Sequence, residues 1–142
     1  MSVFGHFSLS RSGDFLLALT AIVLILTAAV GLSAIKQIEK ARVVTVKSQI
    51  ETFSLALDSY YMDVGEYPTS EQGLSALFVK PVSLSNDNWD GPYLSKAIPK
   101  DPWGNDYQYY VPGENGLPYG IMSLGKDGVE GGEGKDADIT SW

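Results

Sequence analysis

The pattern of apolar and polar residues changes sharply near residue 36. Before that point, 21 residues from Phe15 to Ile35 follow one another without a charge or a proline. A helix of this length spans about 30 Å, the hydrocarbon thickness of a bilayer. A signal sequence would have a shorter apolar core, and a buried soluble helix would carry polar residues at helical spacing. We therefore predict a retained transmembrane helix over residues 14–35, preceded by a leader or cytoplasmic segment at residues 1–13.

Beyond the apolar run, the pattern becomes one-sided without any interruption of the helix. No glycine or proline occurs between Lys36 and Met62, and apolar residues recur at spacings of three and four. This spacing predicts an amphipathic helix that buries one face and continues directly from the membrane segment. The residues of this apolar stripe are Val43, Val46, Ile50, Phe53, Leu57 and Tyr60.

The rest of the chain predicts a small head with short elements. Thr69, with Gln72 three residues later, has the pattern of a helix start, and a short second helix is expected to end near Pro81. Residues 82–104 read as an ordered loop, rich in Ser, Asn, Asp, Gly and Pro. Its expected anchors are Trp89, Tyr93, Leu94 and Ile98.

Two strands are expected after this loop. Tyr107 to Val111 and Tyr119 to Leu124 are separated by turn-forming residues 112–116, which indicates an antiparallel hairpin. The predicted fold class is α+β, with one long helix packed on a small antiparallel sheet. Residues 36–142 form the head, which includes the soluble half of the long helix.

Composition excludes several kinds of chemistry. The chain has no cysteine, and its only histidine, His6, lies before the apolar run. Disulfides, thiolate metal sites and histidine-based catalysis in the head are therefore ruled out. The formal net charge of −7 argues against binding to nucleic acid, whose phosphates require a basic surface.

The C-terminal residues 124–139 hold five acids and five glycines. Such a loop is solvated and mobile unless a hard cation holds it, and calcium binds six to eight carboxylate and carbonyl oxygens. Docking of the terminal Ile139 and Trp142 on the head would favour an ordered, calcium-bound loop over a mobile one. The expected ligands are the carboxylates of Asp127, Asp136 and Asp138, with the carbonyls of Leu124 and Val129.

Three segments resemble the major pseudopilins of bacterial type II secretion systems, which have the pilin-like fold. Residues 60–74 read YYMDVGEYPTSEQGL, residues 101–105 read DPWGN, and the acidic segment begins with Ser123-Leu124-Gly125 and ends near Trp142. The resemblance covers residues 36–142. It implies a structural subunit without catalytic activity, and it places the family's calcium ligands on the same five residues of the acidic loop.

The resemblance also implies partners and a location. Members of this family assemble with copies of themselves into a helical filament that drives export of folded proteins across the outer membrane. The implied partners are minor pseudopilins and an assembly platform in the inner membrane. The chain would cross that membrane once and place its head in the periplasm, although one basic residue before the apolar run and four soon after it predict the opposite orientation.

The N-terminus departs from the family pattern. Prepilin peptidase cuts after a glycine that precedes a phenylalanine-led segment, and the new amine is methylated. The candidates here are Gly5-His6-Phe7 and Gly13-Asp14-Phe15, and neither reproduces the motif. Asp14 either replaces the family's glutamate or simply marks the membrane edge.

Two alternatives remain open from the sequence. A minor pseudopilin or type IV pilin would share the long helix, although pilins usually carry a C-terminal disulfide loop. From a different class, a membrane-tethered carbohydrate-active or carbohydrate-binding domain could use Asp87, Asp90 and the rings of Trp89 and Trp103. The competing interpretation of both tryptophans is that they anchor the loop to the core.

Overall fold

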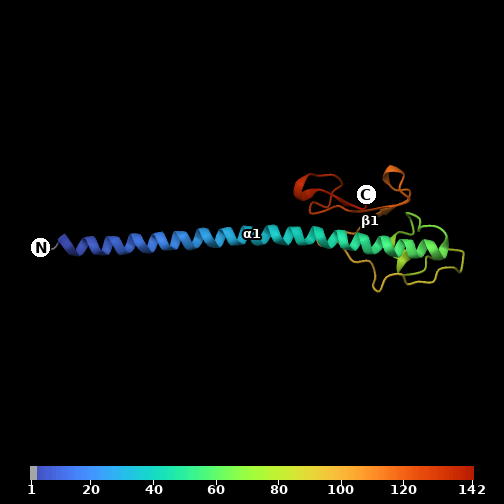
Figure 1. Cartoon of the computed structure of the whole chain (residues 1–142), viewed down its shortest axis with the longest axis horizontal. Coiled ribbons are helices and arrows are strands. Elements are labelled where there is room, and N and C mark those ends of the chain that lie inside the picture. Colours follow the sequence, from blue (N-terminus) through green and yellow to red (C-terminus); the bar gives the residue numbers. More distant parts are fainter. Residues whose placement is uncertain (1–2) are drawn as a thin grey trace. The chain divides into compact units, whose positions relative to one another are not determined.

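The computed structural model describes residues 3–142, with side chains from residue 11 onward. One α-helix, α1 (Val3–Val64), makes up the N-terminal part of the chain (Figure 1). It ends where Gly65 adopts a φ of 89° and donates its amide to the carbonyl of Tyr61 at 2.8 Å, a common glycine cap. The expected continuation of the apolar segment into the amphipathic segment is confirmed.

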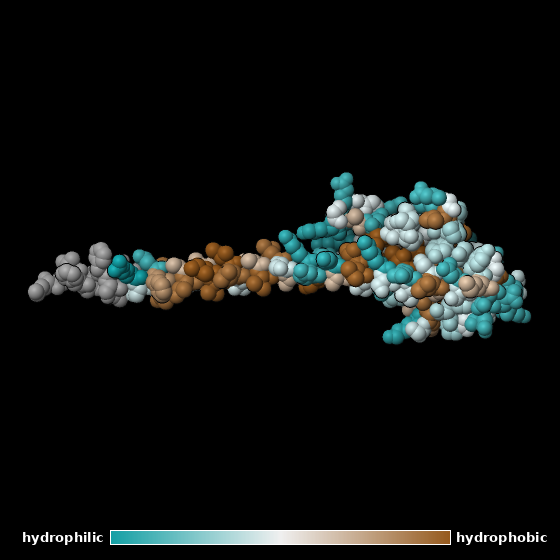
Figure 2. Space-filling model, viewed as in Figure 1, coloured by the Kyte–Doolittle hydropathy of each residue, from teal (hydrophilic) through white to brown (hydrophobic). Residues whose placement is uncertain are grey.

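The chain divides into two compact units at Lys40. In the first unit, the most apolar stretch of α1 has a mean hydropathy of 2.7, and none of it is buried. Leu17 is 71% exposed and Val30 is 70% exposed. Figure 2 shows this part of the helix as a continuous hydrophobic surface. Among the described residues, α1 is the one helix long and apolar enough to cross a membrane.

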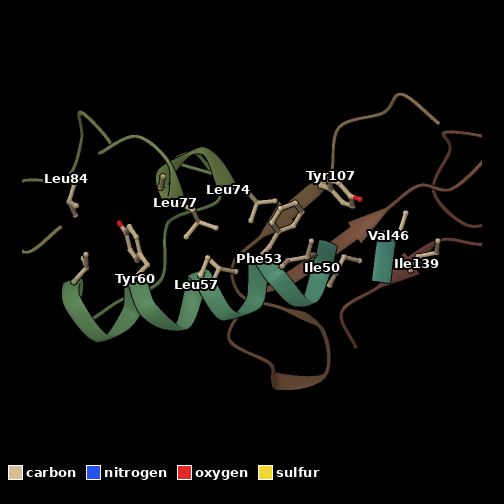
Figure 3. Close-up of a cluster of buried hydrophobic side chains, with 14 residues drawn as sticks. Val46, Ile50, Phe53, Leu57, Tyr60, Leu74, Leu77, Leu84, Tyr107 and Ile139 are labelled. Carbon is tan, nitrogen blue, oxygen red and sulfur yellow. The ribbon is translucent and has the colours of Figure 1, made fainter. Parts of the chain in front are cut away.

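The second unit, Ala41–Trp142, contains the hydrophobic core. The apolar stripe of α1 points into it, as predicted, and its three least exposed members, Val46, Leu57 and Tyr60, are fully buried. Phe53 and Tyr107 meet edge to face with ring centroids 5.1 Å apart (Figure 3). The part of α1 in the second unit therefore buries its apolar stripe against residues from the rest of the head.

A three-stranded antiparallel sheet covers this helix. Its strands are β1 (Gln108–Tyr110), β2 (Gly120–Ser123) and β3 (Ile139–Thr140), with β2 in the centre. The hairpin predicted from the sequence is β1–β2, in which Tyr109 pairs with Ile121. The third strand was not predicted. It arises because Ile139, only 9% exposed, pairs with Ser123 and closes the acidic loop onto the sheet.

The second predicted helix is shorter than expected. Thr69 and Gln72 form the predicted cap. The side chain of Thr69 accepts the backbone amide of Gln72 at 3.1 Å, and the side chain of Gln72 accepts the backbone amide of Thr69 at 3.0 Å. The regular element that follows is only a 3₁₀ turn, Leu74–Leu77, because Gly73 adopts a φ of 64° between cap and helix. This turn buries Leu74 and Leu77 against α1.

Truncation of the helix stripe is expected to weaken the head strongly. Leu57 is fully buried, whereas Leu55 on the same helix is 64% exposed. We expect Leu57→Ala to lower the free energy of unfolding by about 3 kcal/mol, through lost burial and a residual cavity. Urea denaturation of residues 36–142 measures this loss. Leu55→Ala is the matched control, and equal losses in both variants would contradict the assigned core face.

Candidate functional site

The acidic loop after β2 holds the residues predicted to bind calcium, and Asp138 carries the clearest feature of such a site. One carboxylate oxygen of Asp138, Oδ2, accepts the amide of Gly131 at 2.7 Å. The other, Oδ1, is buried and has no hydrogen-bond partner among the described residues. A buried anionic oxygen without a partner is costly, and coordination to a cation would remove that cost.

Asp127 and Asp136 approach one another at Gly132. A Cβ atom on Gly132 would lie 2.4 Å from the carbonyl oxygen of Asp136 and 3.3 Å from Oδ2 of Asp127. A carboxylate and a carbonyl thus converge on a space that only glycine leaves open, and Gly132 also has a φ of 88°. Oxygen donors of these two kinds are those that calcium prefers.

The other two predicted ligands are the backbone carbonyls of Val129 and Leu124, and fewer contacts define their positions. The amide of Val129 donates to Oδ1 of Asp127 at 3.2 Å, so this backbone segment lies beside that carboxylate. Leu124 follows β2 directly and is half-buried. Within the described part of the chain, no three acidic or histidine side chains gather closely enough to hold a metal. The carboxylates of Asp127, Asp136 and Asp138 therefore do not form such a cluster, and the oxygens that converge are a carboxylate oxygen of Asp127 and the carbonyl oxygen of Asp136.

A buried hydrogen-bond network, which no local sequence pattern predicts, holds the start of this loop. Asp101 is only 4% exposed, and its Oδ1 accepts the amides of Trp103 and Asn105 at 3.0 and 2.9 Å. Its Oδ2 accepts the hydroxyl of Ser123 at 2.8 Å. The same hydroxyl oxygen accepts the amide of Gly125 at 3.2 Å. One carboxylate therefore ties the DPWGN turn to the first residues of the acidic loop.

A second contact joins the same two segments. The position of a Cβ on Gly128 would lie 3.2 Å from the side-chain amide nitrogen of Asn105. The DPWGN segment thus supports the acidic loop as well as forming a turn. Ser123 could have been noticed in the sequence, because it lies two residues after Ile121 in a predicted strand and therefore shares the face of that apolar residue.

Removal of the Ser123 hydroxyl tests this network. We expect Ser123→Ala to lower the free energy of unfolding by about 2 kcal/mol, because the buried Asp101 carboxylate loses a donor. Thermal denaturation of residues 36–142 measures the effect, with the exposed Ser85→Ala as the matched control. A cost no larger than that of the control would show that the network adds nothing to the head.

A core tyrosine beside this network has a raised pKa. Desolvation, and secondarily the charge of Asp101, raises the pKa of Tyr107 to about 12. The hydroxyl of Tyr107 donates to the side-chain carbonyl oxygen of Gln49 on α1. This bond joins the helix to the start of the sheet.

The two tryptophans considered for carbohydrate binding are both part of the core packing. Trp89 donates its ring nitrogen to the carbonyl of Ala76 at 2.9 Å and meets Tyr93 edge to face at 5.7 Å. Trp103 packs partly buried against the hydrophobic core. Asp87 pairs with Lys80 at 3.1 Å on the surface. These contacts support the interpretation that the tryptophans anchor the loop.

The candidate residues at the N-terminus are only partly described. Asp14 is exposed and lies within α1, directly before the apolar run. The motif Gly5-His6-Phe7 lies outside the residues whose side chains are described.

Comparison with known proteins adds independent evidence. The family model for the type II secretion system (T2SS) protein G matches residues 33–142. The type II secretion system core protein G of Pseudomonas aeruginosa is 40% identical over 136 residues, which cover 93% of this chain and 95% of that protein. The core protein G of Vibrio cholerae is 48% identical over 105 residues, covering 73% of this chain and 70% of that protein.

A solved structure agrees with these relatives. The crystal structure of the major pseudopilin from the type 2 secretion system of enterohaemorrhagic Escherichia coli matches with a TM-score of 0.62 and 39% sequence identity. The match covers 76% of this chain and 92% of that one. The long helix with a small antiparallel sheet is therefore the pseudopilin fold, and the chain belongs to the type II secretion system protein G family.

Proposed function

We propose that this chain is a structural subunit that assembles with copies of itself into the pseudopilus of a type II secretion system. The filament would extend from the inner membrane and drive export of folded proteins across the outer membrane. Family membership supports this proposal together with one observation, namely the fully exposed apolar part of α1.

The proposal rests mainly on the exposed apolar part of α1, because contact between so large an apolar surface and water is unfavourable. Its side chains are mostly more than half exposed, for example Phe15 at 65% and Ile25 at 67%. A helix that is apolar on all sides needs lipid or other helices around it. The same surface can serve both purposes, first as a membrane anchor and then as the contact between subunits. Contacts between non-equivalent faces of identical subunits do not close, and they generate filaments.

Calcium is the cofactor that we propose for the head. Asp127 and Asp138 would supply carboxylates, while Leu124, Val129 and Asp136 would complete the shell, Asp136 through its carbonyl or its carboxylate. The ion would satisfy the orphaned Oδ1 of Asp138 and offset the repulsion among the loop's carboxylates. Its role would be to order the loop and stabilise the head, with no part in catalysis.

The proposed location is the inner membrane, with the head in the periplasm and with minor pseudopilins and the assembly platform as partners. Protease treatment of spheroplasts tests this orientation. We expect the head to be degraded while cytoplasmic proteins stay intact. Protection of the head in spheroplasts, with cleavage only after detergent is added, would show the opposite orientation and overturn the proposal.

A further inference from the structure

The charges of this chain are divided along its length. Residues 36–47 carry four basic residues against one acid, whereas residues 48–142 carry five lysines against fifteen acids. The segment directly after the apolar run is therefore basic, and the rest of the head, residues 48–142, is strongly acidic. Two copies could attract one another if the basic segment of one met an acidic surface of the other.

The head has a groove suited to a basic side chain. Its volume is about 560 Å³, and its walls combine apolar and aromatic side chains with two carboxylates. The ring of Tyr110 lies over Gly120, where a Cβ would come within 2.6 Å of it, and meets Trp142 edge to face at 5.8 Å. The groove is lined by Tyr110, Glu114, Met122, Leu124, Glu130 and Trp142, among others.

The carboxylates of Glu114 and Glu130 line the groove together with Tyr110. Burial raises the pKa of Tyr110, and the charges of Glu114 and Glu130 raise it further. A lysine entering here would bring its ammonium to carboxylates and to aromatic rings, while its methylene stem would contact the apolar wall.

The groove faces away from the helix of its own head. Residues alternate between the two faces of a strand, and the core side of β2 is formed by Ile121 and Ser123, both fully buried. Met122 and Leu124 line the groove on the opposite face. From Ala41 onward, α1 packs on the core side of the sheet, so the sheet separates the groove from this part of the helix. Lys47, the one lysine on this part of the helix, therefore does not fill the groove.

A stripe of exposed lysines lies on the basic segment. Lys36, Lys40 and Lys47 are exposed and are spaced four and seven residues apart, which places them on one side of a helix. We call these three residues the lysine stripe. Its spacing presents several ammonium groups in a row to one neighbouring surface.

We propose that the groove between Tyr110 and Trp142 binds the lysine stripe of a second copy of this chain. This contact would set the register between neighbouring subunits in the filament, and it rests on the proposed function above. Anionic lipid headgroups could also attract the stripe, since it lies close to the apolar run, and the test separates the two.

Cross-linking tests the contact on the full-length chain in membranes. The chain has no cysteine, so pairs can be introduced without background. Lys36, Lys40 or Lys47 is changed to cysteine together with Glu130→Cys, and a short bis-maleimide is added. We expect a ladder of covalent multimers for at least one pair. The matched control replaces Glu130→Cys with Glu71→Cys, another exposed acid of the head.

The outcomes separate this inference from the proposed function. Filaments whose cross-links at Glu130 do not exceed the Glu71 control, or only intrachain products, would overturn the inference and leave the pseudopilus assignment intact. Multimers absent from every pair, with no filaments by electron microscopy, would overturn both.

Charge reversal supplies a second measurement. Glu114→Lys with Glu130→Lys is expected to lower the assembled fraction about tenfold, as for loss of a partly buried ion pair. Adding Lys36→Glu and Lys40→Glu is expected to restore assembly. If the lysine reversals change only binding to phosphatidylglycerol vesicles and never restore assembly, the stripe serves the membrane and the inference is wrong.

Discussion

Removal of calcium is expected to lower the melting temperature of residues 36–142 by roughly 10–20 °C. At a few hundred times its dissociation constant, a bound ion stabilises a fold by about 3–4 kcal/mol. For a head of this size, that energy corresponds to a shift of the stated magnitude. The reason is local, because without the ion Asp138 keeps an unpaired buried oxygen and the loop's carboxylates repel one another.

Variants of the loop make this test specific. Asp127→Ala and Asp138→Ala should melt at the temperature of the chelated wild type, and added calcium should no longer raise it. Asp106→Ala, whose carboxylate pairs with Lys100 at 3.0 Å on the surface, is the matched control and should keep the full response to calcium. A wild-type melting curve that chelator leaves unmoved would mean that the loop binds no calcium.

A charge in the middle of the apolar run is expected to weaken anchoring and to prevent assembly. Leu24 is 65% exposed and lies near the centre of the run. An arginine at the centre of a membrane helix costs about 3 kcal/mol on insertion scales. Leu24→Arg should therefore lower the share of the chain in the carbonate-resistant membrane fraction and, because the charge would enter the contact between apolar helices, prevent formation of multimers.

The matched control is Leu24→Phe, which keeps the position apolar and should remain in the membrane and assemble as the wild type does. The melting temperature of the head should be the same in all three proteins, because Leu24 belongs to the first unit and the core to the second. Normal assembly of Leu24→Arg would contradict the role assigned to the apolar surface.

The sequence predicted the helix and its core face because both depend on local spacing. A stripe at intervals of three and four can only face one way on a helix, and Phe53 and Leu57 are buried as that spacing requires. The hairpin could also be predicted from the sequence, since its turn-forming residues lie between two segments with the composition of β-strands. The third strand was not, because Ile139 and Thr140 form only a two-residue strand that depends on pairing with the distant β2.

The candidate site could be predicted only in part from the sequence, for a related reason. Acidic residues among glycines indicate a cation, but the convergence of Asp127 with the carbonyl of Asp136 depends on the fold of the loop. The support from Asp101 to Ser123 joins residues 22 positions apart. Such a contact is set by how the loop docks on the sheet, and no local pattern shows it.

Electron microscopy of the full-length chain, extracted from membranes with its N-terminal helix intact, tests the central claim most directly. With calcium present, the chain should form filaments in which identical apolar helices pack together. Particles that remain single subunits both with and without calcium, and that show no contact between copies, would contradict it.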